Sequence, residues 1–227
     1  MKHKRTLYLV IIAALAAAAI GYGTVKHLNA AHLKLTLNGD GLNLTSSNPA
    51  TVRKKLDAFD RADIHLDNTD ITLQSGADFA MVYRGPKGTC PTLTVTDGKL
   101  IAKAAKTAVG AHQDTELVLT IPRSHTELQA LTLASQNGDI TVEPSQTLTV
   151  DTLTLDSQNG DIELSRSAGG TLKATTSNGD IDIEDAAFTT AELTADTGDL
   201  SLVPSDSLAH YTISAKTDTG DIDIEND

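Results

Sequence analysis

A Gly-Asp pair recurs five times in the second half of the chain and constrains its fold more than any other feature. Successive pairs lie 22, 19, 19 and 22 residues apart. Around each pair the same residue types return at the same offsets, with apolar residues seven and five before the glycine and two and four after it. The five glycines are Gly138, Gly160, Gly179, Gly198 and Gly220. Such self-similarity at a period near 20 residues is typical of stacked repeats.

Each repeat predicts a strand, a sharp corner and a second strand. Alternating apolar and polar residues place one face of each strand in a core. Glycine supplies the corner with a backbone conformation that other residues resist, and the preceding asparagine favours a tight turn. One coil cannot bury its own apolar face, so neighbouring coils should stack in parallel register. We therefore expect one column to contain Ile140, Ile162, Ile181, Leu200 and Ile222.

The predicted fold class is all-β: a single-domain parallel β-solenoid preceded by one N-terminal transmembrane helix. The alternative is a β-sandwich of hairpins, in which each Asn-Gly forms a type I′ turn. Alternating segments around 33–44, 64–73, 93–101 and 117–121 predict further strands ahead of the repeats. Part of the segment 50–58 predicts a short helix or a loop, and residues 104–115 predict a loop.

The N-terminus has the pattern of an export signal or a membrane anchor. Lys2, Lys4 and Arg5 precede an apolar stretch from Leu7 to Val25, which is long enough to span a bilayer once. The best cleavage site is weak, so we expect an uncleaved signal-anchor, although cleavage stays open. The positive charges place the N-terminus in the cytoplasm. The predicted order is a cytoplasmic segment (1–5), a transmembrane segment in the lipid (6–25), a juxtamembrane stalk with the first strands (26–60), and an extracellular solenoid (61–227).

The net charge of −12 is unevenly distributed. Residues 26–130 contain 12 Lys and Arg against 11 Asp and Glu, whereas residues 131–227 contain 3 against 19. The second half would repel nucleic acid, which excludes DNA- and RNA-binding proteins as a class.

The repeat text resembles the bacterial "putative adhesin" family of unknown function, whose domains have Gly-Asp-Ile repeats on a β-solenoid. The matching segments are 135–142, 157–164 and 176–183, and the strand that ends at Pro122 resembles the one that precedes the repeats in that family. The resemblance covers about residues 60–227. It implies a solenoid, often with an N-terminal membrane segment, and it supplies no catalytic motif.

The aspartate after each glycine is the main candidate for chemistry. Stacked coils would align Asp139, Asp161, Asp180, Asp199 and Asp221 in one column, with Asp182 and Asp223 in a second, partial column. Like charges about 5 Å apart repel, and calcium, which prefers oxygen ligands, could relieve the repulsion as a weak ladder. The alternative is that each aspartate hydrogen-bonds backbone amides at its own corner.

Catalysis is not expected. The acids belong to the repeat, aromatic platforms for sugars are almost absent, and the histidines are scattered. The single cysteine, Cys90, excludes an intramolecular disulfide. We expect no catalytic residues, no cofactor and no enzyme.

The expected function is a membrane-tethered, extracellular binding or structural module of the cell envelope. Its partner would be an envelope polymer or a membrane protein. Alternatives are an accessory sensor or regulator of envelope stress that acts through a membrane protein, and, third, a polysaccharide-acting enzyme. The acidic last segment, 221–227, should discourage end-to-end stacking, which predicts a monomeric ectodomain.

Overall fold

The computed structural model describes residues 33–38, 41–46, 49–86, 88–103, 115–207 and 210–225. The chain forms two compact units, Met1–Pro49 and Ala50–Asp227. No helix in the described ranges is long and apolar enough to cross a membrane. The predicted segments 1–5 and 6–25 lie outside those ranges.

The first unit contains one antiparallel hairpin of β1 (Leu33–Asn38) and β2 (Gly41–Ser46). Leu37 lies opposite Leu42, and Asn38 lies opposite Gly41. The alternating segment at 33–44 therefore forms the strands that its pattern predicts.

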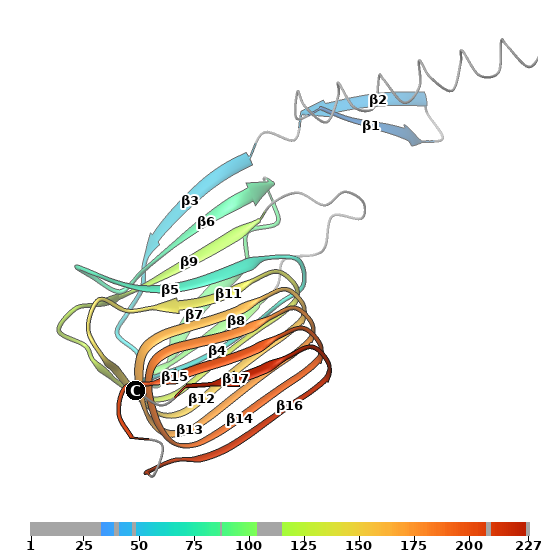
Figure 1. Cartoon of the computed structure of the whole chain (residues 1–227). Coiled ribbons are helices and arrows are strands. Elements are labelled where there is room, and N and C mark those ends of the chain that lie inside the picture. Colours follow the sequence, from blue (N-terminus) through green and yellow to red (C-terminus); the bar gives the residue numbers. More distant parts are fainter. Residues whose placement is uncertain are drawn as a thin grey trace, which may run out of the picture. The chain divides into compact units, whose positions relative to one another are not determined.

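The second unit is a β-solenoid whose coils stack as two sides (Figure 1). Two strands, β13 (Ile162–Asn178) and β14 (Ile181–Thr197), bend around a corner and contribute to both sides. The first side also contains β7 (Thr92–Thr96), β8 (Lys99–Lys103), β4 (Arg61–Leu66), β10 (Glu127–Asn137), β12 (Leu148–Asn159) and β16 (Thr212–Thr219). The second side also contains β3 (Pro49–Lys55), β6 (Ala80–Pro86), β9 (Glu116–Pro122), β5 (Asp70–Gly76), β11 (Ile140–Glu143), β15 (Leu200–Pro204) and β17 (Ile222–Ile224).

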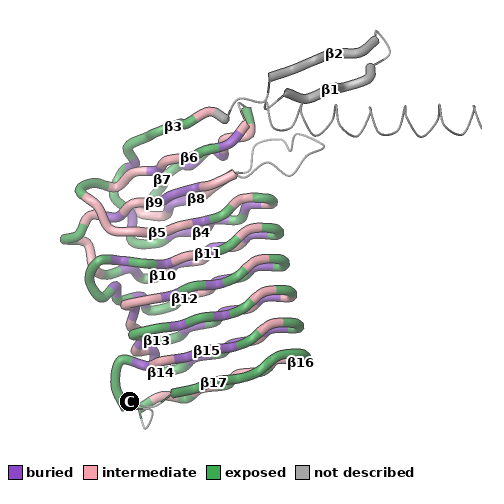
Figure 2. Tube along the Cα trace, turned by 45° about the horizontal axis from the view of Figure 1, so that its top comes forward, coloured by how far each residue is buried: buried purple, intermediate pink, exposed green. Residues whose placement is uncertain are grey.

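The repeats stack in parallel, as predicted, and the β-sandwich alternative is wrong. On the second side, the predicted column of Ile140, Ile162, Ile181, Leu200 and Ile222 pairs layer by layer. On the first side, Leu131, Leu153, Leu172, Ala191 and Ile213 align in the same way. These columns face each other across the core, and Figure 2 shows the buried positions alternating with exposed ones along each coil.

A sixth coil, formed by β4 and β5, was missed because its corner lacks glycine. Ile64 lies beside Leu133, and Ile71 lies beside Ile140, so this coil stacks directly on the first recognised repeat. Thr69 occupies the position of the glycine. Residues 77–126 separate the two coils in sequence. Two strands of this segment stack on the sixth coil, β8 on β4 and β9 on β5.

At the N-terminal end of the stack, which we call the cap, two strand pairings are antiparallel. β6 pairs with β9, and β7 pairs with β8. The prediction of a short helix or loop in part of 50–58 holds only beyond Lys55, where β3 ends and residues 56–59 form a loop. The basic residues of β3 are exposed beside the cap, where Lys54 donates to the carbonyl of Leu93 at 3.1 Å. The predicted loop at 104–115 falls almost entirely outside the described residues.

Extra residues at the corner opposite the glycines explain the two repeat lengths. Each 19-residue coil turns there through one left-handed residue, Arg166 (φ 46°) or Asp185 (φ 51°). In the 22-residue coils, the corners that begin at Pro144 and Pro204 contain three more residues before the next strand aligns. The apolar columns keep their register because the insertions lie outside the strands.

Candidate functional site

A ladder of hydrogen bonds joins the Gly-Asp corners of successive coils. Oδ1 of each aspartate accepts the backbone amide of the aspartate in the next coil, so the bond runs between coils. The alternative prediction, of bonds within each corner, is corrected accordingly. The five bonds run from the amides of Asp139, Asp161, Asp180, Asp199 and Asp221 to the preceding aspartate, at 3.0, 2.9, 2.8, 2.8 and 2.8 Å. The first acceptor is Asp70, in the coil that the repeat count missed.

Two further rows support the same corners. Asparagine amides form a ladder, in which Asn137, Asn159 and Asn178 each donate to the asparagine side chain of the preceding coil, at 2.6, 2.9 and 2.9 Å. Hydroxyl groups form the other row: the buried Ser135, Ser157 and Thr176 and the half-buried Thr217 donate to corner carbonyls of the preceding coil at 2.9–3.0 Å. The buried Ala195 interrupts this hydroxyl row. Each corner is thus held by side chains as well as by the backbone.

The carboxylate row is longer than the sequence suggested. Strand pairing places Glu116 beside Asp70, and Arg84 beside Glu116, at the N-terminal end of the row. The similarity of Asp70-Ile-Thr-Leu73 to Asp139-Ile-Thr-Val142 was a signal for the extra coil. The local sequence does not predict that Arg84 lies beside the row, because Arg84 belongs to β6, which runs antiparallel to β9.

The two sides of the solenoid differ sharply in charge. The second side exposes carboxylates in three parallel rows, and we call it the acidic side. Its first row is Asp70, Asp139, Asp161, Asp180, Asp199 and Asp221, its second is Glu163, Asp182 and Asp223, and its third is Glu143, Glu184 and Glu225. The outward positions of the first side mix threonines with charges of both signs, some of them in ion pairs such as Lys173–Glu192 at 3.6 Å.

A cleft of about 430 Å³ lies at the N-terminal end of the acidic side. It is lined by Asp70, Thr72, Arg84, Glu116, Asp139 and Thr141. The guanidinium of Arg84 forms an ion pair with Glu116, and both side chains are partly exposed, at 51% and 36%. The cleft therefore contains a cation, Arg84, which strand pairing aligns with the carboxylate row.

The predicted calcium ladder has no direct structural support. Its five aspartates do align, and neighbouring strands lie about 4.8 Å apart. Four of them use Oδ1 to accept an amide of the next coil. Within the part of the chain that the structure describes, no group of three or more His, Cys, Asp or Glu could hold a metal ion. Calcium binding by this row stays a prediction.

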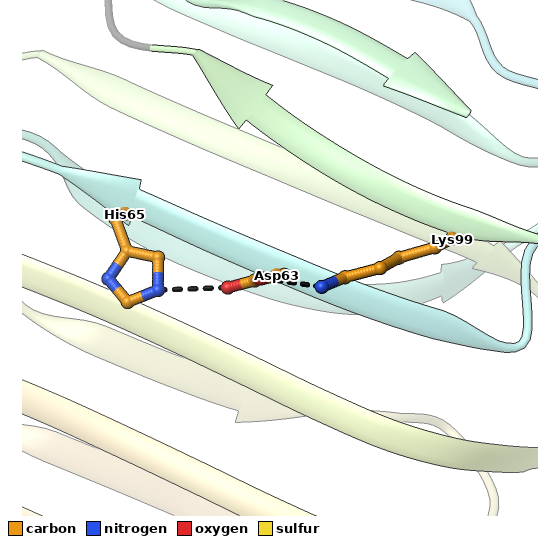
Figure 3. A network of polar contacts seen from close by, with 3 residues as sticks. All are labelled: Asp63, His65 and Lys99. Atoms are coloured by element: carbon orange, nitrogen blue, oxygen red, sulfur yellow. Dashed lines mark hydrogen bonds and ion pairs between the residues drawn. The ribbon is translucent and has the colours of Figure 1, made fainter. Parts of the chain in front are cut away.

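A polar network of Asp63, His65 and Lys99 lies on the first side (Figure 3). Lys99 donates to Oδ2 of Asp63 at 2.6 Å, and Nε2 of His65 lies 2.8 Å from Oδ1. The hydrogen bond from Lys99 is the main cause that lowers the pKa of Asp63 below its usual value of 3.8, and burial opposes it. His65 is 66% exposed, so the network resembles a surface charge cluster rather than an enclosed catalytic site.

His125 and Cys90 do not line the cleft. His125 packs edge-on against Phe79, with ring centroids 4.9 Å apart, and its Nε2 is 3.7 Å from Asp60. Cys90 is a free, half-buried thiol, and burial raises its pKa, which makes it a poor nucleophile.

Comparison with known proteins finds one matching family and several similar solved structures. The model of the family described as Toastrack DUF4097 matches residues 59–227. A search of curated proteins finds no match. Similar solved structures include a "putative adhesin" from Bacteroides fragilis, at 17% identity and a TM-score of 0.42 over 79% of this chain and 98% of that one. Another is a "putative cell adhesion protein" from Clostridium sporogenes, at 10% identity and a TM-score of 0.43 over 79% and 100%. A third is a "putative adhesin" from Parabacteroides distasonis, at 8% identity and a TM-score of 0.38 over 78% and 97%.

Proposed function

The chain belongs to the Toastrack DUF4097 family, and from this premise we propose that it is a non-catalytic binding module of the bacterial cell envelope. In this proposal, residues 6–25 tether the chain to the cell membrane and the solenoid lies outside the cell. The acidic side is the surface that binds an envelope polymer with cationic groups.

The observation that supports this function is the fixed spacing of the carboxylate row. Each aspartate is bonded to the next coil, so the carboxylates repeat at the strand spacing of about 4.8 Å. A polymer with repeated ammonium groups can meet such a row at several points at once, which multiplies weak contacts into useful avidity. A preformed surface also loses little conformational entropy on binding.

The carboxyl group of Asp63 does not have the character of a general acid. A catalytic carboxylic acid commonly has a raised pKa, whereas the hydrogen bond from Lys99 lowers the pKa of Asp63. A sensor or regulator of envelope stress that acts through a membrane protein is the second candidate, since the same surface could bind a basic protein face. A polysaccharide-acting enzyme is the third.

The test removes charge from either side without touching the ladder. The triple variant Glu163→Gln, Asp182→Asn, Asp223→Asn neutralises exposed carboxylates of the acidic side. The matched control, Asp156→Asn, Glu192→Gln, Asp196→Asn, neutralises the same number on the first side. Full-length proteins in lipid nanodiscs are incubated with isolated envelope polymer and with solubilised membrane proteins.

The first variant should bind envelope polymer at least about tenfold more weakly, a loss of about 1.4 kcal/mol. The control should bind like the wild type. Equal losses in the two variants would refute a role for the acidic side. Retention of membrane proteins instead of polymer would favour the sensor, and calcium-dependent or calcium-independent cleavage of acidic polysaccharide would favour the enzyme.

We also propose that the ectodomain is monomeric. β16 and β17 are the last described strands, and Ile222 and Ile224 are 45% and 36% exposed there. The adjacent carboxylates of Asp221, Asp223 and Glu225 would repel a second copy brought edge to edge. Light scattering of the purified protein should give one copy, and filaments at low salt would contradict this proposal.

A further inference from the structure

The cleft at the N-terminal end of the acidic side differs in charge from the rest of the carboxylate row. Along the row, strand pairing places Arg84, Glu116, Asp70 and Asp139 on four neighbouring strands. From Asp139 onward every aligned residue is an aspartate. The cleft therefore begins at a cation and ends at an anion, whereas the repeats beyond it offer only anions.

Two adjacent hydroxyl groups also distinguish the cleft from the next two coils. Thr72 and Thr141 lie side by side in the row next to the carboxylates. In the next two coils their position is taken by Glu163 and Asp182. Every side chain that lines the cleft is polar or charged, so it offers no aromatic platform for a sugar ring.

The two ends of the cleft are both available to a ligand. Arg84 uses its Nη1 for Glu116, and a guanidinium has further N–H donors. Asp139 uses Oδ1 to accept the amide of Asp161, and its carboxylate is exposed. Three strand spacings separate the backbones of these two residues, which is about 14 Å. The side chain of Arg84 extends along the row toward Glu116, whereas the carboxylate of Asp139 bonds the amide of Asp161 in the next coil. A volume of about 430 Å³ is within the range of ligand pockets, roughly 300–1,000 Å³.

We propose that this cleft binds a short zwitterionic peptide, with its carboxylate on Arg84 and its ammonium on Asp139. An extended tripeptide spans about 10 Å, and a hydrogen bond of about 3 Å at each end extends its reach to about 16 Å, which covers the span of about 14 Å between the two strands. The threonine hydroxyls lie alongside to bond the peptide backbone. This inference rests on the proposed function and names the ligand class of one end of the acidic side.

The ligand test uses trialanine as the probe, together with N-acetyl-trialanine, trialanine amide and the doubly blocked peptide. Binding to the full-length protein in nanodiscs is followed by ligand-observed NMR in the presence of a calcium chelator. Trialanine should bind roughly tenfold more tightly than either singly blocked form, the order expected for one hydrogen bond to a charged group. Equal binding of all four peptides, or of none, would overturn the proposal.

Two variants assign the charges to their residues. Asp139→Asn keeps an oxygen that can accept the amide of Asp161, so it should abolish the preference for a free ammonium and leave the ladder intact. Arg84→Gln should abolish the preference for a free carboxylate and leave the ammonium preference. The control, Asp199→Asn, has the same hydrogen bond outside the cleft and should leave both preferences unchanged.

The outcomes separate this inference from the function it rests on. A protein that binds envelope polymer through the acidic side but shows no preference for trialanine refutes the cleft proposal alone. Equal effects of Asp139→Asn and Asp199→Asn would mean that the row acts only through its total charge, which also refutes it. If none of the acidic-side variants binds envelope polymer more weakly than the wild type, the proposed function is refuted, regardless of the peptide results.

Discussion

Replacing Gly179 with alanine tests the close stacking of the corners. Gly179 has a φ of +155°, and a Cβ there would lie 2.2 Å from the carbonyl oxygen of Gly160 in the preceding coil. That oxygen belongs to the backbone of a paired corner, so it cannot move without disturbing the ladder. The strained dihedral costs about 1–3 kcal/mol. The forced contact adds about 1–3 kcal/mol.

Gly88→Ala is the matched control, because it separates the dihedral from the contact. Gly88 also has a positive φ, +95°, but a Cβ there would meet nothing within 4 Å. It should lose only the dihedral term, so Gly179→Ala should be the less stable variant by about 1–3 kcal/mol. For a domain of this size that difference corresponds to about 2–12 °C in melting temperature.

Far-ultraviolet circular dichroism is the suitable assay, because the protein contains no tryptophan. Thermal and urea unfolding of the two variants and the wild type are recorded side by side. If Gly179→Ala is no less stable than Gly88→Ala, the corners do not approach as closely as described and the stacking argument is wrong.

Three further predictions concern the ladders and the surface charges. Ala195→Ser should stabilise the protein by about 0.5–1 kcal/mol in urea unfolding, because its hydroxyl would restore the interrupted row by donating to the carbonyl of Gly179; destabilisation would contradict that geometry. Lys99→Met should raise the pKa of Asp63 in an NMR titration. The lowered pKa of Asp63 stabilises the fold above about pH 4, and this contribution disappears as the pH falls through the folded pKa; a wild-type titration in the variant would refute the Lys99 contact. Calcium bound to one site, at a concentration equal to its dissociation constant, would add about 0.4 kcal/mol to the free energy of unfolding. If the carboxylate row is only a scaffold, replacing chelator with calcium should therefore change the melting temperature by less than about 2 °C. A larger rise would establish the calcium ladder.

Some features of the ladders were accessible from the local pattern and others were not. The aspartate column was predicted because the Gly-Asp pair has a constant offset from the apolar positions. The direction of its hydrogen bonds was not, because an aspartate can bond its own turn or a neighbouring one with the same local sequence. Only the placement of the next coil, one strand spacing away, decides in favour of the bond from Asp161 to Asp139.

The missed coil has a similar explanation. Asp70-Ile-Thr-Leu73 repeats the pattern of the later coils, but Thr69 stands where they have glycine. The 50 residues from 77 to 126 then separate it from the coil on which it stacks. Repeats are recognised by their regular spacing, so an imperfect copy at a long and irregular distance is easily overlooked.

The sequence by itself determined the repeating coil: where each strand lies, which residues point inward, and where each glycine corner falls. These features depend on residues a few positions apart, and alternation and turn chemistry encode them locally. Only the tertiary structure decided that 61–76 stacks on 127–143 and that Arg84 meets the carboxylate row. Both depend on which distant strands become neighbours, and hydrogen bonds between strands specify the partner only after the intervening chain has folded back.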